Sequence, residues 1–288
     1  MSHVLDQLTA LLRLERIEEN LFRGQSQDLG WGRVFGGQVL GQALSAAEQT
    51  VPEGRTVHSF HGYFLRPGDA QKPIVYDVER IRDGRGFTTR RVVAIQDGRP
   101  IYSMGSSFQA DEPGYDHQDP MPLDVPAPEA LTSELELARA NADRIPLMMR
   151  AQAVADRPIE IRAVEPFNVL RPKVAEPRAR YWYRAAGSLP DEPHLHQYLL
   201  AYASDFQFLG TSLRPHGRSW LSPGMHVASL DHAMWFHRPF RFDDWLLYVI
   251  DSPSASGARG LVRGQFFTRD GVLVASTAQE GLIRPPAG

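Results

Sequence analysis

The stretch from His194 to Leu213, HLHQYLLAYASDFQFLGTSL, decides the fold, because it predicts a long central helix. Its apolar side chains recur at the three- and four-residue spacing of one helix face. They are Leu195, Tyr198, Leu199, Tyr202, Phe206 and Leu209. Asp205 falls three residues after Tyr202 and shares this apolar stripe. A lone carboxylate is costly to bury, so Asp205 must be solvated, paired or hydrogen-bonded. It is either a tolerated structural group or part of a functional site.

The composition of the 288-residue chain is that of an ordinary soluble globular protein, with 42% hydrophobic and 23% charged residues. The formal net charge is −3 and the charges are interspersed, so nothing indicates nucleic-acid or membrane binding. The chain has no cysteine, which excludes disulfides, thiolate catalysis and cysteine metal sites, and fits a reducing compartment. Residues 1–20 do not resemble a signal peptide, and no apolar run reaches membrane-spanning length. We therefore expect a cytoplasmic protein.

The first half of the chain predicts a helix followed by four extended segments. The helix is expected over Val34–Thr50, VFGGQVLGQALSAAEQT, where early glycines permit the close approach of another backbone or strand. A shorter helix is expected over residues 4–14, and residues 21–31 are interpreted as a loop. The pair Asp97-Gly98 is a strong signal for a hairpin between the last two extended segments. The four segments are Thr56–Arg66, Pro73–Arg82, Gly86–Gln96 and Pro100–Gln109.

The second half repeats this pattern after the Asp205 helix. Aligned by eye, Asp97-Gly98 falls on Asp270-Gly271, and Arg66-Pro67 falls on Arg238-Pro239. We interpret the chain as an internal duplication in the α+β class, in which a helix and a four-strand antiparallel sheet occur twice. A largely apolar helix beside curved strands suggests a sheet wrapped around a helix. The strands expected in the second half are Met225–Arg238, Trp245–Asp251, Arg259–Arg269 and Val272–Ile283.

The two halves differ where chemistry is possible. Asp205 falls opposite Ala46, and Gln279 falls opposite Ser106. The second half therefore has polar groups where the first half has small residues. One functional copy and one largely structural copy would give this pattern. Random divergence of the two sequences, with no functional consequence, would give it equally well.

A segment rich in proline and acidic residues, 111–130, separates the halves and is typical of an inter-domain linker. Ser133 and Glu136 have the spacing of a capping box for a short helix. Extended segments return at Ile159–Val164 and Arg178–Ala185. The expected division is a first repeat over residues 1–110, a linker with short helices over 111–157, and a second repeat with the functional residues over 158–288.

Four segments resemble the acyl-CoA thioesterase II family, above all its bacterial members, over nearly the whole chain. They are FRGQSQDLGWGRVFGGQVLGQAL, VHSFHGYFLRPGD, LDHAMWFHRPFRFDDWLLY and SPSASGARGLVRGQFFTRDGVLVASTAQEGLIR. The resemblance implies a double hotdog, whose two repeats form one continuous curved sheet around two central helices. It also implies an acyl-CoA thioesterase of fatty acid and lipid metabolism that forms a homo-oligomer, either a dimer or a tetramer. No cofactor, metal, nucleic acid or membrane partner is implied.

The family's catalytic residues correspond to three positions of this sequence. The aspartate on the second hotdog helix corresponds to Asp205 of YASDFQFL, and the glutamine on the last strand to Gln279 of ASTAQEG. The hydroxyl residue near the start of the following strand corresponds to Ser229, just before LDHAMW. Bacterial members of the family have threonine at that place. Serine keeps the hydroxyl but lacks the methyl group that restricts the rotamer of threonine.

Hydrolysis of a thioester requires a nucleophile and donors for the developing oxyanion. Without cysteine or a metal-ligand motif, water is the expected nucleophile. A carboxylate can take its proton while an amide and a hydroxyl orient it, and Asp205, Gln279 and Ser229 supply these groups. Backbone amides near a helix or strand end are the expected oxyanion donors. Direct attack by Asp205, giving an anhydride, is a second mechanism.

Two other functions stay open at this point. A hotdog hydratase or dehydratase acting on acyl-CoA would use an aspartate with a histidine on a hydration motif, and the sequence shows no such helix-borne pair. A non-catalytic acyl-CoA-binding protein would not need Asp205 and Gln279 together. An apolar tunnel for the acyl chain is expected between the central helices and the strands around them. The preferred acyl chain length depends on the volume of this tunnel, which the sequence does not fix.

Other polar groups fit a site less well. Asp231 and His232 are neighbours on an expected strand, so their side chains point to opposite faces. His194 and His196 are two residues apart on a helix and do not face each other. Most strand arginines are solvated, although four of them could neutralise the phosphates of CoA. They are Arg90, Arg91, Arg259 and Arg263.

Overall fold

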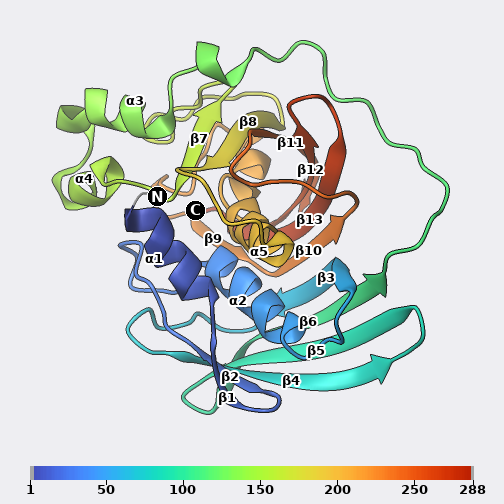
Figure 1. The fold of residues 1–288 in the computed structure, drawn as a ribbon. Helices are drawn as coiled ribbons and strands as arrows, with labels where there is room; N and C mark the ends of the chain where they lie inside the picture. Colours follow the sequence, from blue (N-terminus) through green and yellow to red (C-terminus); the bar gives the residue numbers. More distant parts are fainter. Residues whose placement is uncertain (1–2, 287–288) are drawn as a thin grey trace.

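An antiparallel sheet wraps around two central helices in the computed structural model, which describes residues 3–286 (Figure 1). The helices are α1 (His3–Leu12), α2 (Gly36–Glu48), α3 (Glu134–Ala140), α4 (Leu147–Val154) and α5 (Pro193–Ser204), and the 3₁₀ helices are η1 (Pro128–Ala130), η2 (Ala142–Arg144) and η3 (Leu209–His216). The strands of the first half are β1 (Glu15–Glu18), β2 (Leu21–Gly24), β3 (Arg55–Phe64), β4 (Ile74–Asp83), β5 (Phe87–Gln96) and β6 (Arg99–Ala110). Those of the second half are β7 (Ile159–Ala163), β8 (Arg178–Ala185), β9 (His226–Ser229), β10 (Asp231–Phe236), β11 (Leu246–Ser256), β12 (Arg259–Thr268) and β13 (Leu273–Arg284).

The sheet topology confirms the predicted duplication. The strand order is β1-β2-β4-β5-β6-β3-β10-β13-β12-β11-β8-β7, with β9 paired to β13. Strands β3 and β10 pair antiparallel, so the sheets of the two repeats join edge to edge. The order β4-β5-β6-β3 on one side of this seam is matched by β11-β12-β13-β10 on the other. In Figure 1 the cyan strands of the first repeat and the orange and red strands of the second enclose α2 and α5.

The predicted hairpin at Asp97-Gly98 is present and joins β5 to β6. Both residues have a positive φ, 49° for Asp97 and 70° for Gly98. This is the backbone of the two-residue turn that matches the twist of paired strands, and glycine and aspartate tolerate it better than other residues do.

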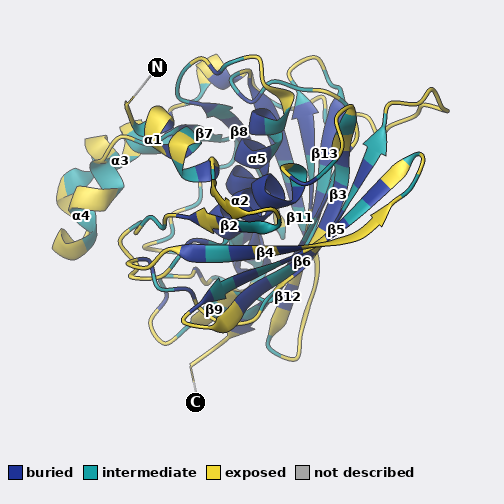
Figure 2. Cartoon of the chain, turned by 60° about the horizontal axis from the view of Figure 1, so that its bottom comes forward, coloured by how far each residue is buried: buried dark blue, intermediate teal, exposed yellow. Residues whose placement is uncertain are grey.

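The two central helices touch backbone to backbone, as the early glycines of α2 predicted. Both helices are buried on almost every face, in the centre of the fold (Figure 2). A Cβ added at Gly37 would lie 2.1 Å from the carbonyl oxygen of Tyr202, and one at Gly41 would lie 3.0 Å from that of Tyr198. Side chains at these positions would force α2 and α5 apart.

Three predicted elements differ from the structure. The helix expected over 194–213 ends at Ser204, because Gln207 takes a left-handed φ of 58° and the chain continues as η3. The strand expected over 225–238 is divided at Leu230, whose carbonyl accepts the N–H of Phe64, the last residue of β3. Before Leu230, β9 pairs with β13 alone, and after it β10 pairs with both β3 and β13. The loop expected over 21–31 contains β2, which pairs with β1 and β4.

The segment between β6 and β7 lies over the outer face of the second repeat. Trp182 donates its indole N–H to the carbonyl of Pro126, and Arg162 donates to the carbonyls of Pro128 and Leu131. The predicted capping box of Ser133 forms at the start of α3, which begins a short helical region. Within residues 3–286, no helix is long and apolar enough to cross a membrane.

Candidate active site

Asp205, Ser229 and Gln279 meet on the inner side of the sheet. Asp205 follows the last turn of α5, Ser229 ends β9, and Gln279 is a buried residue of β13. The Nε2 of Gln279 donates to Asp205 Oδ1 at 3.2 Å and to Ser229 Oγ at 2.5 Å. The sheet and the helix therefore bring together the three residues singled out in the sequence.

The first repeat contributes a backbone amide to this group. The N–H of Gly37, in the first turn of α2, donates to Asp205 Oδ2 at 3.0 Å. Gly36 lies so close that an added Cβ would be 2.5 Å from the same oxygen. The positive end of the α2 dipole thus faces the carboxylate. This role was not found in the sequence, although the glycine pair at the start of a helix was its visible signal.

Burial raises the pKa of Asp205 from 3.8 to about 6, while hydrogen bonds from Gln279, Gly37 and Ser229 oppose the rise. The residue as a whole is nevertheless not fully buried. A carboxylate with a pKa just below neutrality is ionised at pH 7 and is still basic enough to take a proton in a reaction.

The side-chain oxygen of Gln279 is free to bind a further group. The carboxylate of Asp205 can only accept hydrogen bonds, so the NH₂ of Gln279 must face it and the oxygen must point elsewhere. That oxygen, Oε1, is buried and has no hydrogen-bond partner among residues 3–286. Buried amide oxygens normally have a partner, and a water molecule beside Asp205 would be a suitable one.

The corresponding place in the first repeat has no such group. Ser106 pairs with Phe60 between β6 and β3. In the second repeat, Ala233 of β10 pairs with Ala278 of β13, so the next pair along the strands is His232 with Gln279. Gln279 thus takes the same place between β13 and β10 as Ser106 takes between β6 and β3, in agreement with the alignment.

A cation occupies the inner side of the first repeat instead. Arg90, the partner of Ser106 on β5, is fully buried. Its guanidinium donates to Thr50 Oγ1 at 2.9 Å and to Asp83 at 2.7 Å. A buried guanidinium therefore lies against the end of α2, where the second repeat has Asp205 at the end of α5.

The structure gives other contacts to His194, His196 and His232, the histidines that fitted a site poorly in the sequence. Among residues 3–286, no cluster of His, Asp and Glu side chains could hold a metal ion. His196 accepts the N–H of Phe242, while His194 lies 3.5 Å from Glu48. His232 is fully buried, which lowers its pKa to about 3. Asp231 accepts the backbone N–H of Glu280 instead of contacting His232.

The four arginines considered for phosphate binding are all paired with carboxylates. Arg90 pairs with Asp83, Arg91 with Glu79, Arg259 with Glu280 and Arg263 with Asp251. None of these pairs points to a role in binding CoA.

Two family models match this chain. One, described as acyl-CoA thioesterase, matches residues 148–282, and the other, described as acyl-CoA thioesterase N-terminal domain, matches residues 26–109. Acyl-CoA thioesterase 2 of Haemophilus influenzae is 47% identical over 99% of both chains. Human acyl-coenzyme A thioesterase 8 is 43% identical over 96% of this chain and 88% of its own.

Solved structures show the same architecture. The acyl-CoA thioesterase II TesB2 from Mycobacterium marinum has a TM-score of 0.79 at 43% identity, with 98% of each chain covered. A hot dog fold protein of unknown function from Alicyclobacillus acidocaldarius has a TM-score of 0.78 at 19% identity and covers the whole of both chains. The second likeness concerns the fold alone and agrees with the expected double hotdog.

Proposed function

The chain belongs to the acyl-CoA thioesterase family and hydrolyses acyl-CoA to a fatty acid and CoA, and we propose that Asp205, Ser229 and Gln279 activate the attacking water. The observation that carries this assignment is the Asp205 carboxylate, which Gln279 and Gly37 hold from two sides in a largely buried site.

Asp205 acts in this proposal as a general base and then as a general acid. It takes one proton from a water molecule that donates its other hydrogen to Gln279 Oε1 and accepts the proton of the Ser229 hydroxyl, which turns from Asp205 to the water. The water oxygen forms a bond to the thioester carbonyl carbon, and the carbonyl π electrons move to oxygen. The oxyanion electrons then re-form the C=O bond as the C–S bond breaks, the C–S electron pair leaves on the CoA sulfur, and Asp205 returns the proton to that thiolate. The carboxylate is then ready for another turnover.

The backbone N–H of Gly36, the first residue of α2, is the proposed donor to the oxyanion, because the N–H of Gly37 is already bound to Asp205. The Gly36 amide carries the partial positive charge of the helix N-terminus. Fixed donors of this kind stabilise negative charge that develops only in the transition state.

The assignment is tested first by following CoA release with a thiol reagent over straight-chain acyl-CoAs of increasing length. The protein has no cysteine, so its own side chains add no background. Thiol release that depends on Asp205 supports the proposal. Tight binding of acyl-CoA without thiol release would indicate the binding protein that the sequence left open.

The pH dependence of kcat/KM gives a second test, because it reports the ionisation of the free enzyme. Only ionised Asp205 can accept a proton, and its pKa is raised to about 6. We expect kcat/KM to be level above about pH 7 and to fall tenfold per pH unit well below pH 6. Thermal unfolding at each pH checks that the protein stays folded. A profile that is flat down to pH 4.5 would contradict the role of Asp205 as the base.

We further propose the division into a first repeat (1–110), a linker (111–157) and a second repeat (158–288). The match of the N-terminal family model to residues 26–109 supports the first boundary. The absence of cysteine fits the reducing cytoplasm, and release of fatty acids fits a role in lipid metabolism.

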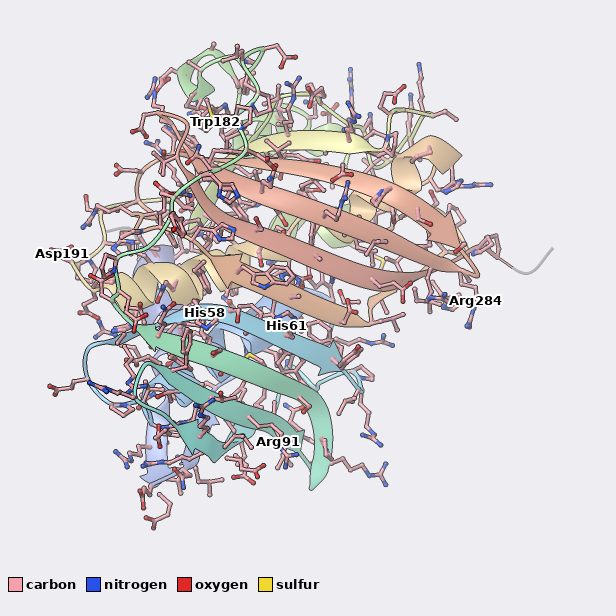
Figure 3. All side chains as sticks on the ribbon, turned by 90° about the vertical axis from the view of Figure 1, so that its right-hand side faces the viewer. His58, His61, Arg91, Trp182, Asp191 and Arg284 are labelled. Atoms are coloured by element: carbon pink, nitrogen blue, oxygen red, sulfur yellow. The ribbon has the colours of Figure 1, made fainter. Side chains whose placement is uncertain are left out.

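The outer face of the first repeat supports the proposed homo-oligomer. The linker does not cover this face, where His58 and His61 of β3 stand on the sheet (Figure 3). Tyr63 is 63% exposed and Phe87 is 43% exposed. Exposed aromatic side chains on a sheet face are typical of an interface. The mass of the particle in solution distinguishes a monomer from a dimer or a tetramer.

A further inference from the structure

The turn that carries Asp205 is a strained piece of backbone. Asp205 has near-helical angles, φ −85° and ψ −11°, but Gln207, two residues later, has a φ of 58°. A side chain other than glycine rarely takes this left-handed conformation, and the surrounding structure must hold it there. Contacts with the surrounding structure must therefore hold the backbone of this turn in place.

Two buried tyrosines supply such contacts. Tyr248 of β11 donates its hydroxyl to the carbonyl of Ser204 at 3.2 Å. Tyr183 of β8 donates its hydroxyl to the carbonyl of Phe206 at 3.0 Å. Both tyrosine side chains are fully buried. The residues immediately before and after Asp205 are thus each held by one tyrosine.

Tyr248 also connects this turn to the strand that carries Gln279. Its hydroxyl lies 2.9 Å from Thr277 Oγ1. Because the proton of Tyr248 goes to a carbonyl, which can only accept, Thr277 must be the donor of this second bond. Thr277 and Gln279 are two residues apart on β13 and face the same side. The positions of Asp205 and Gln279 are therefore linked through one tyrosine hydroxyl.

We propose that Tyr183 and Tyr248 are positioning residues, which orient Asp205 by fixing the carbonyl groups of Phe206 and Ser204. This inference rests on the proposed role of Asp205 as the base. Neither tyrosine contacts the proposed water; each acts through the backbone that carries the carboxylate. Burial raises the pKa of both phenols well above the ordinary value, so their hydroxyls remain protonated donors.

The duplication provides a matched control. Tyr76 pairs with Ala94 on β5 as Tyr248 pairs with Phe266 on β12, so the two tyrosines occupy equivalent places in the repeats. Tyr76 is also fully buried and donates its hydroxyl to Gln42 at 2.7 Å. Tyr76→Phe removes the same kind of bond, but in the repeat that lacks Asp205, Ser229 and Gln279.

The experiment compares kcat, KM and Tm for Tyr183→Phe, Tyr248→Phe, Thr277→Val and Tyr76→Phe. We expect kcat to fall about 10- to 100-fold in the Tyr183 and Tyr248 variants with KM unchanged within about twofold, because small misplacements of catalytic groups have effects of this size. Thr277→Val should lower kcat in the same direction. Tyr76→Phe should lower Tm as much as Tyr248→Phe does but keep kcat within about twofold.

Two further outcomes separate the possible failures. In an Asp205→Asn background, Tyr248→Phe should cause no further loss, because there is no base left to position. If Tyr183→Phe and Tyr248→Phe keep the normal kcat while Asp205→Asn loses it, the positioning role is wrong and the base stands. If Tyr76→Phe loses as much activity as Tyr248→Phe, the effect is general loosening of the fold, and the proposal is also wrong. Normal activity of Asp205→Asn would overturn both assignments.

Discussion

Replacing Asp205 by asparagine is expected to lower kcat by about 10²- to 10⁴-fold, the usual contribution of a general base. Asparagine has nearly the same size, and its oxygen can still accept the N–H of Gly37, so the fold should be retained. Thiol release from acyl-CoA measures the effect.

The same substitution is expected to stabilise the protein at high pH. The pKa of Asp205 is 3.8 in an ordinary environment and about 6 in the folded chain, so folding disfavours the ionised form. Below about pH 3.8 the group is neutral in the folded chain and largely neutral in the unfolded chain, so the penalty is close to zero. Well above pH 6 it is ionised in both states, and the full penalty of up to about 3 kcal/mol applies. Asp205→Asn should therefore raise the free energy of unfolding at pH 8 but not at pH 3.5.

Asp231→Asn is the control for the predicted loss of kcat in Asp205→Asn. Asp231 is a nearby carboxylate that accepts the backbone N–H of Glu280, and an amide oxygen can accept that bond equally well. Its kcat should stay within about threefold of the unchanged enzyme. Equal losses in the two variants, or an active Asp205→Asn, would show that Asp205 is not the base.

Replacing Gly37 by alanine is expected to destabilise the fold far more than the same change at Gly105. The added Cβ would lie 2.1 Å from the carbonyl oxygen of Tyr202, and a backbone atom cannot rotate away. Overpacking of this kind costs about 3 kcal/mol, which corresponds to a fall in Tm of roughly 5–10 °C for a domain of this size. Activity should fall as well, because the amide of Gly37 holds Asp205.

Gly105→Ala is the matched control. Gly105 lies in the middle of β6, and no atom lies within 4 Å of its added Cβ. Alanine there should leave Tm unchanged or raise it slightly, because it loses less backbone entropy than glycine on folding. A Gly37→Ala variant as stable as Gly105→Ala would contradict the close crossing of α2 and α5.

Periodic elements could be predicted well from this sequence, and backbone irregularities could not. The two central helices, the hairpin at Asp97-Gly98 and the repeated strand pattern follow from apolar spacing and turn chemistry. The end of α5 does not, because Phe206 and Leu209 keep the helical spacing although the backbone turns at Gln207. That left-handed residue is stabilised by contacts distant in sequence, such as the bond from its side chain to Glu134.

In the candidate site, too, some residues could be predicted from the sequence and others are recognised only from their contacts in the fold. The family resemblance identified Asp205, Ser229 and Gln279, and the structure brings them into contact. Gly37 and the two tyrosines were not identified, because a backbone amide has no sequence signature and a buried tyrosine resembles core filler. The four strand arginines do not support a phosphate-binding site, because each of them pairs with a carboxylate in the structure.

A single turnover in H₂¹⁸O, with enzyme in excess over acyl-CoA, tests most directly whether Asp205 activates water or attacks the thioester itself. If water attacks the thioester carbonyl carbon directly, the fatty acid carries one ¹⁸O, the peptide that contains Asp205 carries none, and hydroxylamine added during the turnover leaves no hydroxamate at Asp205. Either ¹⁸O in the Asp205 carboxylate together with unlabelled fatty acid, or a hydroxamate at Asp205, would show an anhydride intermediate and would contradict the general-base mechanism.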